Sequence, residues 1–171
     1  MSPYAAVATA VLAAGAVRAE ETCTVEVGPG ERFAQDRDVV VQPGEHLKNV
    51  TALRGRVVVK GGAEVDEAMA VGGDLVVEPG GKVNRGATSV GGDVQLRGDA
   101  RVGESVVSLG GDVIRSKDAQ VGGTVVAFSV KVGDRSLAQS IERQIAAPRC
   151  KVVRAAERPA AAVGTGRGQP L

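Results

Sequence analysis

The chain has no tryptophan and only three aromatic residues in 171, namely Tyr4, Phe33 and Phe128. A hydrophobic core must therefore be built from Val, Leu, Ile and Ala. The sequence also has a single histidine, His46, which excludes any metal site that needs two or three imidazole ligands. Basic and acidic residues nearly balance, at 21 and 20, and this balance argues against general nucleic-acid binding or polybasic membrane binding.

Long apolar runs are also missing, apart from one near the N-terminus. The Ala-rich stretch Ala5–Val17 is too short to span a bilayer. Val17-Arg18-Ala19 places small residues at both positions that a signal peptidase reads, and two glutamates follow. We therefore predict an export signal over residues 1–19 and a periplasmic or secreted location. A frayed N-terminal helix is the alternative interpretation.

Cysteine is scarce as well, with Cys23 and Cys150 near opposite ends of the mature chain. In an oxidising compartment an even pair indicates a disulfide, and two separate thiols are the alternative. No Cys-x-x-Cys motif supports a zinc site or redox catalysis.

Glycine is abundant, with 24 residues, but without the Gly-X-Y period of collagen. An aliphatic-Gly-Gly-Asp-aliphatic motif recurs at a constant spacing at Val71–Leu75, Val90–Val94 and Leu109–Val113, and Leu53–Val57 matches it upstream at a spacing one residue shorter. Within this long repeat, large aliphatic residues recur at every sixth position from Val41. A second position, usually small or apolar, follows each of these residues by four, so the spacings alternate between four and two. Such spacings do not follow a helical face. They favour short strands separated by sharp, glycine-containing turns.

The repeat predicts an all-β fold, a single-stranded parallel β-helix. We expect a triangular solenoid of about five coils of about 18–19 residues, which stack about 4.8 Å apart. The expected coils are 35–52, 53–70, 71–89, 90–108 and 109–127. Equivalent residues of successive coils then superpose, so we expect an inward-facing aliphatic row made of Leu53, Val71, Val90 and Leu109.

The two ends of the chain depart from the repeat. Residues 20–34 are expected to form an N-terminal strand and cap, and residues 35–133 the β-helix. Leu137, Ile141 and Ile145 recur at every fourth position before Pro148, which predicts a short C-terminal capping helix within 134–150. Residues 151–171 are predicted to be a disordered tail. Five stacked coils would hold the cysteines about 24 Å apart. A disulfide needs Cα atoms within about 7 Å, so one terminal segment would have to run back along the coils.

The hexad pattern resembles two families. The runs Val71-Gly-Gly-Asp-Leu-Val-Val-Glu-Pro-Gly-Gly-Lys-Val83 and Val90-Gly-Gly-Asp-Val-Gln-Leu96 are similar to those of bactofilins, polymer-forming bacterial cytoskeletal proteins with a right-handed β-helix. The pattern also resembles the hexapeptide-repeat transferases, which are left-handed β-helices. Either resemblance covers residues 35–132, and it implies an architecture more than a chemistry. The spacing leaves the handedness open.

Few residues could carry chemistry. His46 occupies an outward position in the first coil, and the transferase resemblance would make it a general base that a neighbouring carboxylate polarises. No long insertion interrupts the repeats to form an acceptor pocket, so we favour a lone surface histidine. Each Gly-Gly-Asp turn offers one carboxylate, whereas calcium needs six or more oxygens. We expect no catalytic residue, no cofactor and no metal site.

Three outward rows are distinctive. A charge ladder is expected along Arg56, Asp74, Asp93, Asp112 and Lys131. Two charge-poor stripes are expected to be covered by terminal segments of the chain or by a partner. The alternative is ordinary surface, because β-branched residues favour strands. The first stripe follows Val58, Val76, Gln95 and Ile114, and the second follows Ala52, Ala70, Thr88, Val107 and Val126. The remaining face carries the polar row His46, Glu64, Lys82, Arg101 and Gln120.

The sequence thus predicts an exported, non-enzymatic β-helical protein of structural or scaffolding type. Its expected partners are further copies of itself, through faces or ends, or another envelope protein. We expect no nucleic-acid partner, and no small-molecule substrate is evident. The alternative is a hexapeptide-repeat acyltransferase-like enzyme that uses His46.

Overall fold

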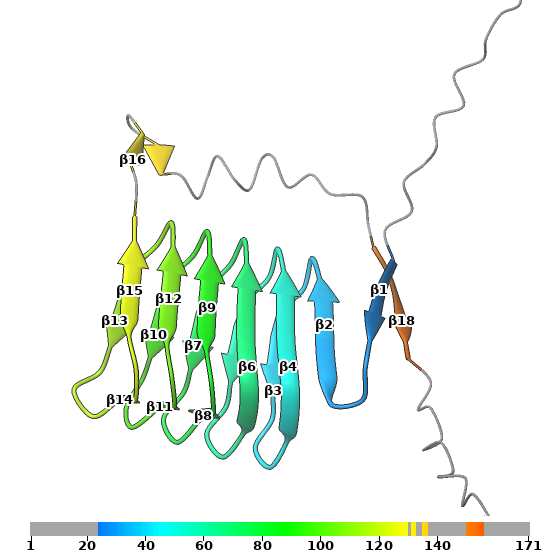
Figure 1. Ribbon diagram of the computed structural model, residues 1–171, viewed down its shortest axis with the longest axis horizontal. Coiled ribbons are helices and arrows are strands. Elements are labelled where there is room, and N and C mark those ends of the chain that lie inside the picture. Colours follow the sequence, from blue (N-terminus) through cyan, green and yellow to red (C-terminus); the bar gives the residue numbers. More distant parts are fainter. Residues whose placement is uncertain (1–23, 130, 133–134, 137–149, 156–171) are drawn as a thin grey trace, which may run out of the picture.

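The computed structural model describes residues 24–129, 131–132, 135–136 and 150–155. Within these ranges the chain is all-β, and its parallel strands stack into a β-solenoid of about five turns (Figure 1). The predicted fold class is confirmed. The described ranges contain no helix, and so none that could cross a membrane.

The strands form three faces that follow one another in each coil. The first face contains β3 (Val39–Val41), β5 (Val57–Val59), β7 (Leu75–Val77), β10 (Val94–Leu96) and β13 (Val113–Arg115). The second face contains the first residues of β4 (His46–Leu53) and β6 (Glu64–Val71), then β8 (Lys82–Val83), β11 (Arg101–Val102) and β14 (Gln120–Val121). The third face contains β2 (Glu31–Gln35), the remainder of β4 and β6, then β9 (Ala87–Val90), β12 (Val106–Leu109) and β15 (Val125–Phe128).

The register follows the sequence repeat. Val57 pairs with Leu75, and Leu75 pairs with Val94, so the second step along the chain is one residue longer than the first. Because Val65 pairs with Val83 but Ala68 pairs with Ala87, the extra residue of the longer coils lies between Val83 and Ala87. The predicted bulge therefore lies at the corner between the second and third faces.

The core is a column of Val, Leu and Ala side chains inside the prism. Its largest fully buried members include Val41, Leu75, Val94 and Leu96. Two serines, Ser89 and Ser108, are also fully buried. Their hydroxyl groups donate 3.0 Å hydrogen bonds to the carbonyl oxygens of Gly73 and Gly92, respectively. These bonds satisfy the hydroxyl donors inside the apolar interior.

One predicted core row faces outward instead. Leu53, Val71, Val90 and Leu109 do pair across successive coils. However, they are only partly buried, and 41 % of Leu109 is exposed. Side chains alternate along a strand. Their preceding neighbours, Ala52, Ala70, Ser89 and Ser108, are fully buried and point inward. Small residues occupy these inward positions of the third face.

Glycines let the coils approach closely at the corner between the third and first faces. A Cβ atom on Gly73, Gly92 or Gly111 would overlap the backbone carbonyl of the preceding coil. The residue before each of them adopts a positive φ, for example 85° at Gly91. In an earlier coil Arg54 adopts φ 55° at this position. Its side chain forms an ion pair with Asp36, with Nε and Oδ1 2.6 Å apart.

The β-helix begins earlier than predicted. We expected it to start at residue 35, but β2 pairs in parallel with β4 from Glu31 onward and so forms part of a first coil. Beyond β2 lies a separate two-stranded parallel sheet made of β1 (Thr24–Val27) and β18 (Lys151–Arg154) (Figure 1).

The C-terminal segments also differ from prediction. Lys151–Arg154 was expected in the disordered tail, yet it forms β18, because β1 supplies partners for its backbone groups. The capping helix was expected within 134–150, with Asp134 or Ser136 as its N-cap. Arg135–Ser136 forms β17, which pairs antiparallel with β16 (Lys131–Val132), and this leaves only the later start. The remainder of the predicted helix, residues 137–149, lies outside the described residues. So do the predicted signal over residues 1–19 and the tail after Ala155.

Candidate functional site

Each end of the core column carries an arginine at an inward position. Arg32 of β2 pairs with the buried Val50, and Arg115 of β13 pairs with the buried Leu96. Residues that pair in register on neighbouring coils point to the same side of the sheet. Both arginines therefore occupy positions at which the neighbouring coil has a buried aliphatic residue. The two ends of the solenoid differ in the groups that surround these arginines.

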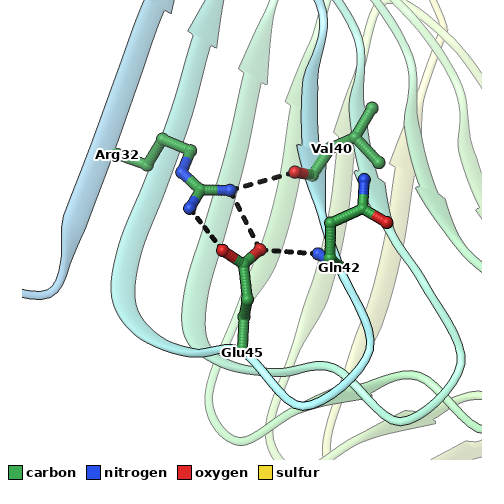
Figure 2. A network of polar contacts seen from close by, with 4 residues as sticks. All are labelled: Arg32, Val40, Gln42 and Glu45. Atoms are coloured by element: carbon green, nitrogen blue, oxygen red, sulfur yellow. Dashed lines mark hydrogen bonds and ion pairs between the residues drawn. The ribbon is translucent and has the colours of Figure 1, made fainter.

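The N-terminal end is closed by a polar clamp (Figure 2). Arg32 Nη1 donates to the carbonyl oxygen of Val40 at 3.0 Å, and Arg32 Nη2 donates to Glu45 Oε1 at 2.7 Å. Glu45 Oε2 also accepts a 2.6 Å hydrogen bond from the backbone N–H of Gln42. The Arg32 guanidinium, and then the Gln42 amide, hold the pKa of Glu45 below its usual value. We call this group of residues the Arg32–Glu45 clamp. Its arginine donates a hydrogen bond to a backbone carbonyl of the edge strand β3.

Sequence reasoning missed this clamp. Its two charged partners, Arg32 and Glu45, are separated by less than one coil, so their spacing is not a period of the repeat. The available signal was Arg32 itself, a charge located one coil before the aliphatic Val50.

The C-terminal end has no such clamp among the described residues. There β13, β14 and β15 each pair with a solenoid strand on one side only. Val125 is in register with the fully buried Val106, yet it is 43 % exposed because no described coil follows it. Phe128 is 56 % exposed. Arg115 is exposed and makes no ion pair within the described ranges. The last coil therefore presents exposed apolar side chains and an exposed arginine that has no ion pair among the described residues.

The aspartates of the predicted charge ladder join one coil to the next. Asp74 Oδ1 accepts the backbone N–H of Asp93 at 3.0 Å, and Asp93 Oδ1 accepts that of Asp112 at 2.9 Å. In an earlier coil Asp38 holds the N–H of Arg56 in the same way, at 2.8 Å. The carboxylate of Asp112 accepts no such bond from residues 24–129. The last acceptor of the series therefore has no backbone N–H donor among these residues.

The two cations of the ladder behave differently from the expectation. Arg56 forms an ion pair with Asp38, with Nη2 and Oδ2 2.9 Å apart. This partner lies in the preceding coil, whereas the ladder placed Arg56 next to Asp74. Lys131 belongs to β16, which pairs with β17 and with no solenoid strand.

The first charge-poor stripe is one continuous row, because Val58, Val76, Gln95 and Ile114 pair across successive coils. Val58 is partly buried, and after it the exposure rises from 5 % at Val76 to 54 % at Ile114.

The second charge-poor stripe was predicted with two wrong members, because the register was misassigned by one residue. Ala52 and Ala70 are fully buried and point inward. The residues that share a row with Thr88, Val107 and Val126 are Thr51 and Met69. A slip of one residue moves a side chain to the other face of a strand, and the extra residue of the longer coils produced that slip. The corrected row is still uncharged.

The second face carries the predicted polar row in register. Glu64 lies between His46 and Lys82, with His46 Nδ1 3.4 Å from Glu64 Oε2 and Lys82 Nζ 2.9 Å from Glu64 Oε1. Hydrogen bonds from Lys82 and Asn84 lower the pKa of Glu64. The His46 side chain is 71 % exposed. A hollow of about 430 Å³ on this face is lined by residues of the three later coils, and His46 is not among them.

Cys150 lies beside the first coil. Its backbone N–H donates a 2.7 Å hydrogen bond to Gln35 Oε1. Cys23 lies outside the described residues, but the next residue, Thr24, pairs with Lys151 in the parallel β1–β18 sheet. The two cysteines thus immediately precede paired positions. Their disulfide stays a prediction.

No three His, Cys, Asp or Glu side chains gather into a possible metal site in the part of the chain that the structure describes. Comparison with known proteins gave no match: no protein-family model, no curated protein and no solved structure matches this chain.

Proposed function

We propose that this chain is an exported, non-enzymatic structural protein that associates with further copies of itself through the last coil of its solenoid. The observation that carries the proposal is the difference between the two ends. Strands at both ends of the solenoid pair with a solenoid strand on one side only, but the Arg32–Glu45 clamp closes the first end, whereas the last coil presents exposed apolar residues.

Unpaired strand edges favour association because their N–H and C=O groups can continue a sheet into another chain. The apolar side chains of Val113, Val121 and Val125 lie on the edge strands β13, β14 and β15, at the end of the core. Apolar groups gathered at one place on a surface indicate a contact site. Burying them against a second copy would remove them from water, and the open carboxylate of Asp112 could accept an amide of that copy.

Arg115 limits the strength of this contact. An inward-pointing charge at a sheet edge opposes pairing, and the burial of an unpaired charge costs several kcal/mol. The proposed association is therefore reversible, and its extent depends on protein concentration.

Sedimentation velocity of the full chain over a range of concentrations tests this proposal. We expect Val125→Asp to abolish the concentration dependence. Val153→Asp is the matched control, because Val153 is a similarly exposed valine (40 %, against 43 % for Val125) on β18, beyond the other end of the solenoid. A wild-type chain that is monomeric at every concentration would refute the proposal, as would equal effects of the two variants.

The alternative, an acyltransferase that uses His46, has one observation in its favour, the 3.4 Å contact between His46 and Glu64. Titration with acyl-coenzyme A tests it. Saturable binding that His46→Ala weakens would favour the enzyme, whereas no binding would favour the structural role.

A further inference from the structure

An uncharged surface runs along the whole third face of the solenoid. It consists of two adjacent outward rows, which we call the apolar stripe. The first row is Phe33, Thr51, Met69, Thr88, Val107 and Val126, and the second is Gln35, Leu53, Val71, Val90, Leu109 and Phe128. The stripe extends from β2 in the first coil to β15 in the last, and its exposed members include Leu109, Val126 and Phe128.

The last strand of the solenoid and the described residue Cys150 lie at opposite ends of this stripe. Phe128 ends the second row, and Ser136 follows it closely through the β16–β17 pair. At the other end, the N–H of Cys150 is bonded to the side chain of Gln35, which begins the same row. The intervening residues, 137–149, must therefore cross from the last coil to the first.

The length of this segment is close to what a helix needs to cross from the last coil to the first. Five strand spacings separate β15 from β2, which is about 24 Å. Thirteen residues span about 20 Å as an α-helix, at a rise of about 1.5 Å for each residue, and about twice that distance when fully extended. Leu137, Ile141 and Ile145 recur at helical spacing, and they would form a single apolar side of such a helix.

We infer that residues 137–149 lie lengthwise along the apolar stripe as an amphipathic helix, with Leu137, Ile141 and Ile145 against the second row. The segment thus covers the side of the solenoid, in contrast to the end cap that its sequence suggested. The inference does not depend on the proposed function, which concerns the end of the last coil.

Tryptophan fluorescence tests this inference, because the chain has no tryptophan of its own. Ile141→Trp places a single reporter on the apolar side of the segment, and Gln139→Trp places one on the opposite side. In the full-length chain we expect the emission of Ile141→Trp to be blue-shifted relative to that of Gln139→Trp, at every protein concentration.

A second substitution identifies the surface that the reporter touches. In the Ile141→Trp background, Leu109→Asp should shift the emission back to the red, whereas Ile114→Asp should not. Both positions are exposed aliphatic residues, at 41 % and 54 %, and Ile114 lies on the first face. Circular dichroism of each variant shows whether the solenoid stays folded.

Three results would overturn the inference: equal emission from the two reporters, a blue shift that folded Leu109→Asp leaves unchanged, or a blue shift that disappears on dilution. The last result would assign the stripe to a second copy.

Discussion

At the scale of single residues, aspartate side chains connect each coil to the next. A Gly-Gly-Asp turn can be read as a source of charge or as a source of hydrogen-bond acceptors. The contacts from Asp74 to the Asp93 amide and from Asp93 to the Asp112 amide show the second role. The three stacked carboxylates still repel one another along the ladder. The two effects can be separated by mutation.

We expect Asp93→Asn to be neutral or slightly stabilising, because asparagine keeps an acceptor for the Asp112 amide and removes the repulsion. Asp93→Ala should lower the free energy of unfolding by about 1 kcal/mol, the usual contribution of one hydrogen bond. Thermal melts at low and high salt measure both effects. A clear loss of stability in Asp93→Asn at low salt would contradict the repulsion, and a neutral Asp93→Ala would contradict the acceptor role.

The Arg32–Glu45 clamp predicts a loss of stability in acid. Glu45 has a lowered pKa in the folded chain, so its ionised form contributes stability that is complete above the unfolded pKa near 4.5. That contribution disappears as the pH falls through the lower folded pKa. Denaturant unfolding at pH 7 and pH 3 should therefore show a smaller difference in Glu45→Gln than in the wild type. Glu104→Gln is the control, because Glu104 is exposed and makes no ion pair among the described residues. An identical pH dependence in Glu45→Gln and the wild type would exclude the clamp as a source of stability.

At the scale of strands and turns, the six-residue pattern was sufficient to predict the parallel strands, the coil length and the place of the extra residue. The direction of individual side chains was harder to predict. A one-residue insertion exchanges inward and outward positions, which is why Ala52 was assigned to the row of Thr88. Leu53 was assigned inward because it is aliphatic, whereas the smaller Ala52 occupies the inward position. The Arg32–Glu45 clamp and the β1–β18 pair lie outside the repeat, so no periodic signal indicated them. The pairing of β18 depends on a contact between residues at opposite ends of the described chain.

Glycine at the coil corner should be irreplaceable. A Cβ atom on Gly92 would overlap the carbonyl oxygen of Gly73, so Gly92→Ala must push two coils apart. We expect a loss of about 2–3 kcal/mol in the free energy of unfolding, as for other overpacked sites. Gly86→Ala is the matched control, because the nearest atoms to its Cβ would lie 3.8 Å away. Urea denaturation compares the two variants, and equal stability would contradict the close approach.

The β1–β18 register sharpens the prediction of a disulfide. Cys23 and Cys150 precede the paired residues Thr24 and Lys151. We therefore expect mass spectrometry of the non-reduced, exported protein to find them joined. Cys150→Ser should lower the stability by up to about 4–5 kcal/mol, the chain-entropy value for so long a loop. Two free thiols in the exported protein would show that this prediction is wrong.

At the scale of the whole molecule, two similar arginines meet different surroundings at the two ends of one core. Arg32 has an anionic partner that closes its end, whereas Arg115 has none in the described part of the chain. The solenoid consequently has a direction, with one end that the clamp closes and one end that exposes apolar residues.

Replacing Arg115 should strengthen the proposed self-association. Arg115→Leu continues the aliphatic column of Leu96 and Val77 to the end of the solenoid. We expect the dissociation constant for self-association to fall about tenfold or more, which corresponds to about 1.4 kcal/mol. Analytical ultracentrifugation measures it. Arg101→Leu, an exposed arginine on the second face, should leave the constant unchanged, and a similar fall in both variants would indicate a general effect of lost charge.

The parallel pairing of β1 with β18 also determines how the molecule would respond to a mechanical load. A tether that pulled on residues before Thr24 and after Arg154 would draw these two strands past each other along their length, so that all their hydrogen bonds would resist together. The five coils lie within the loop that this pair closes, and they would carry no tension while the pair, or the predicted disulfide beside it, held. The solenoid could therefore be held under force at its N-terminal end without being unwound.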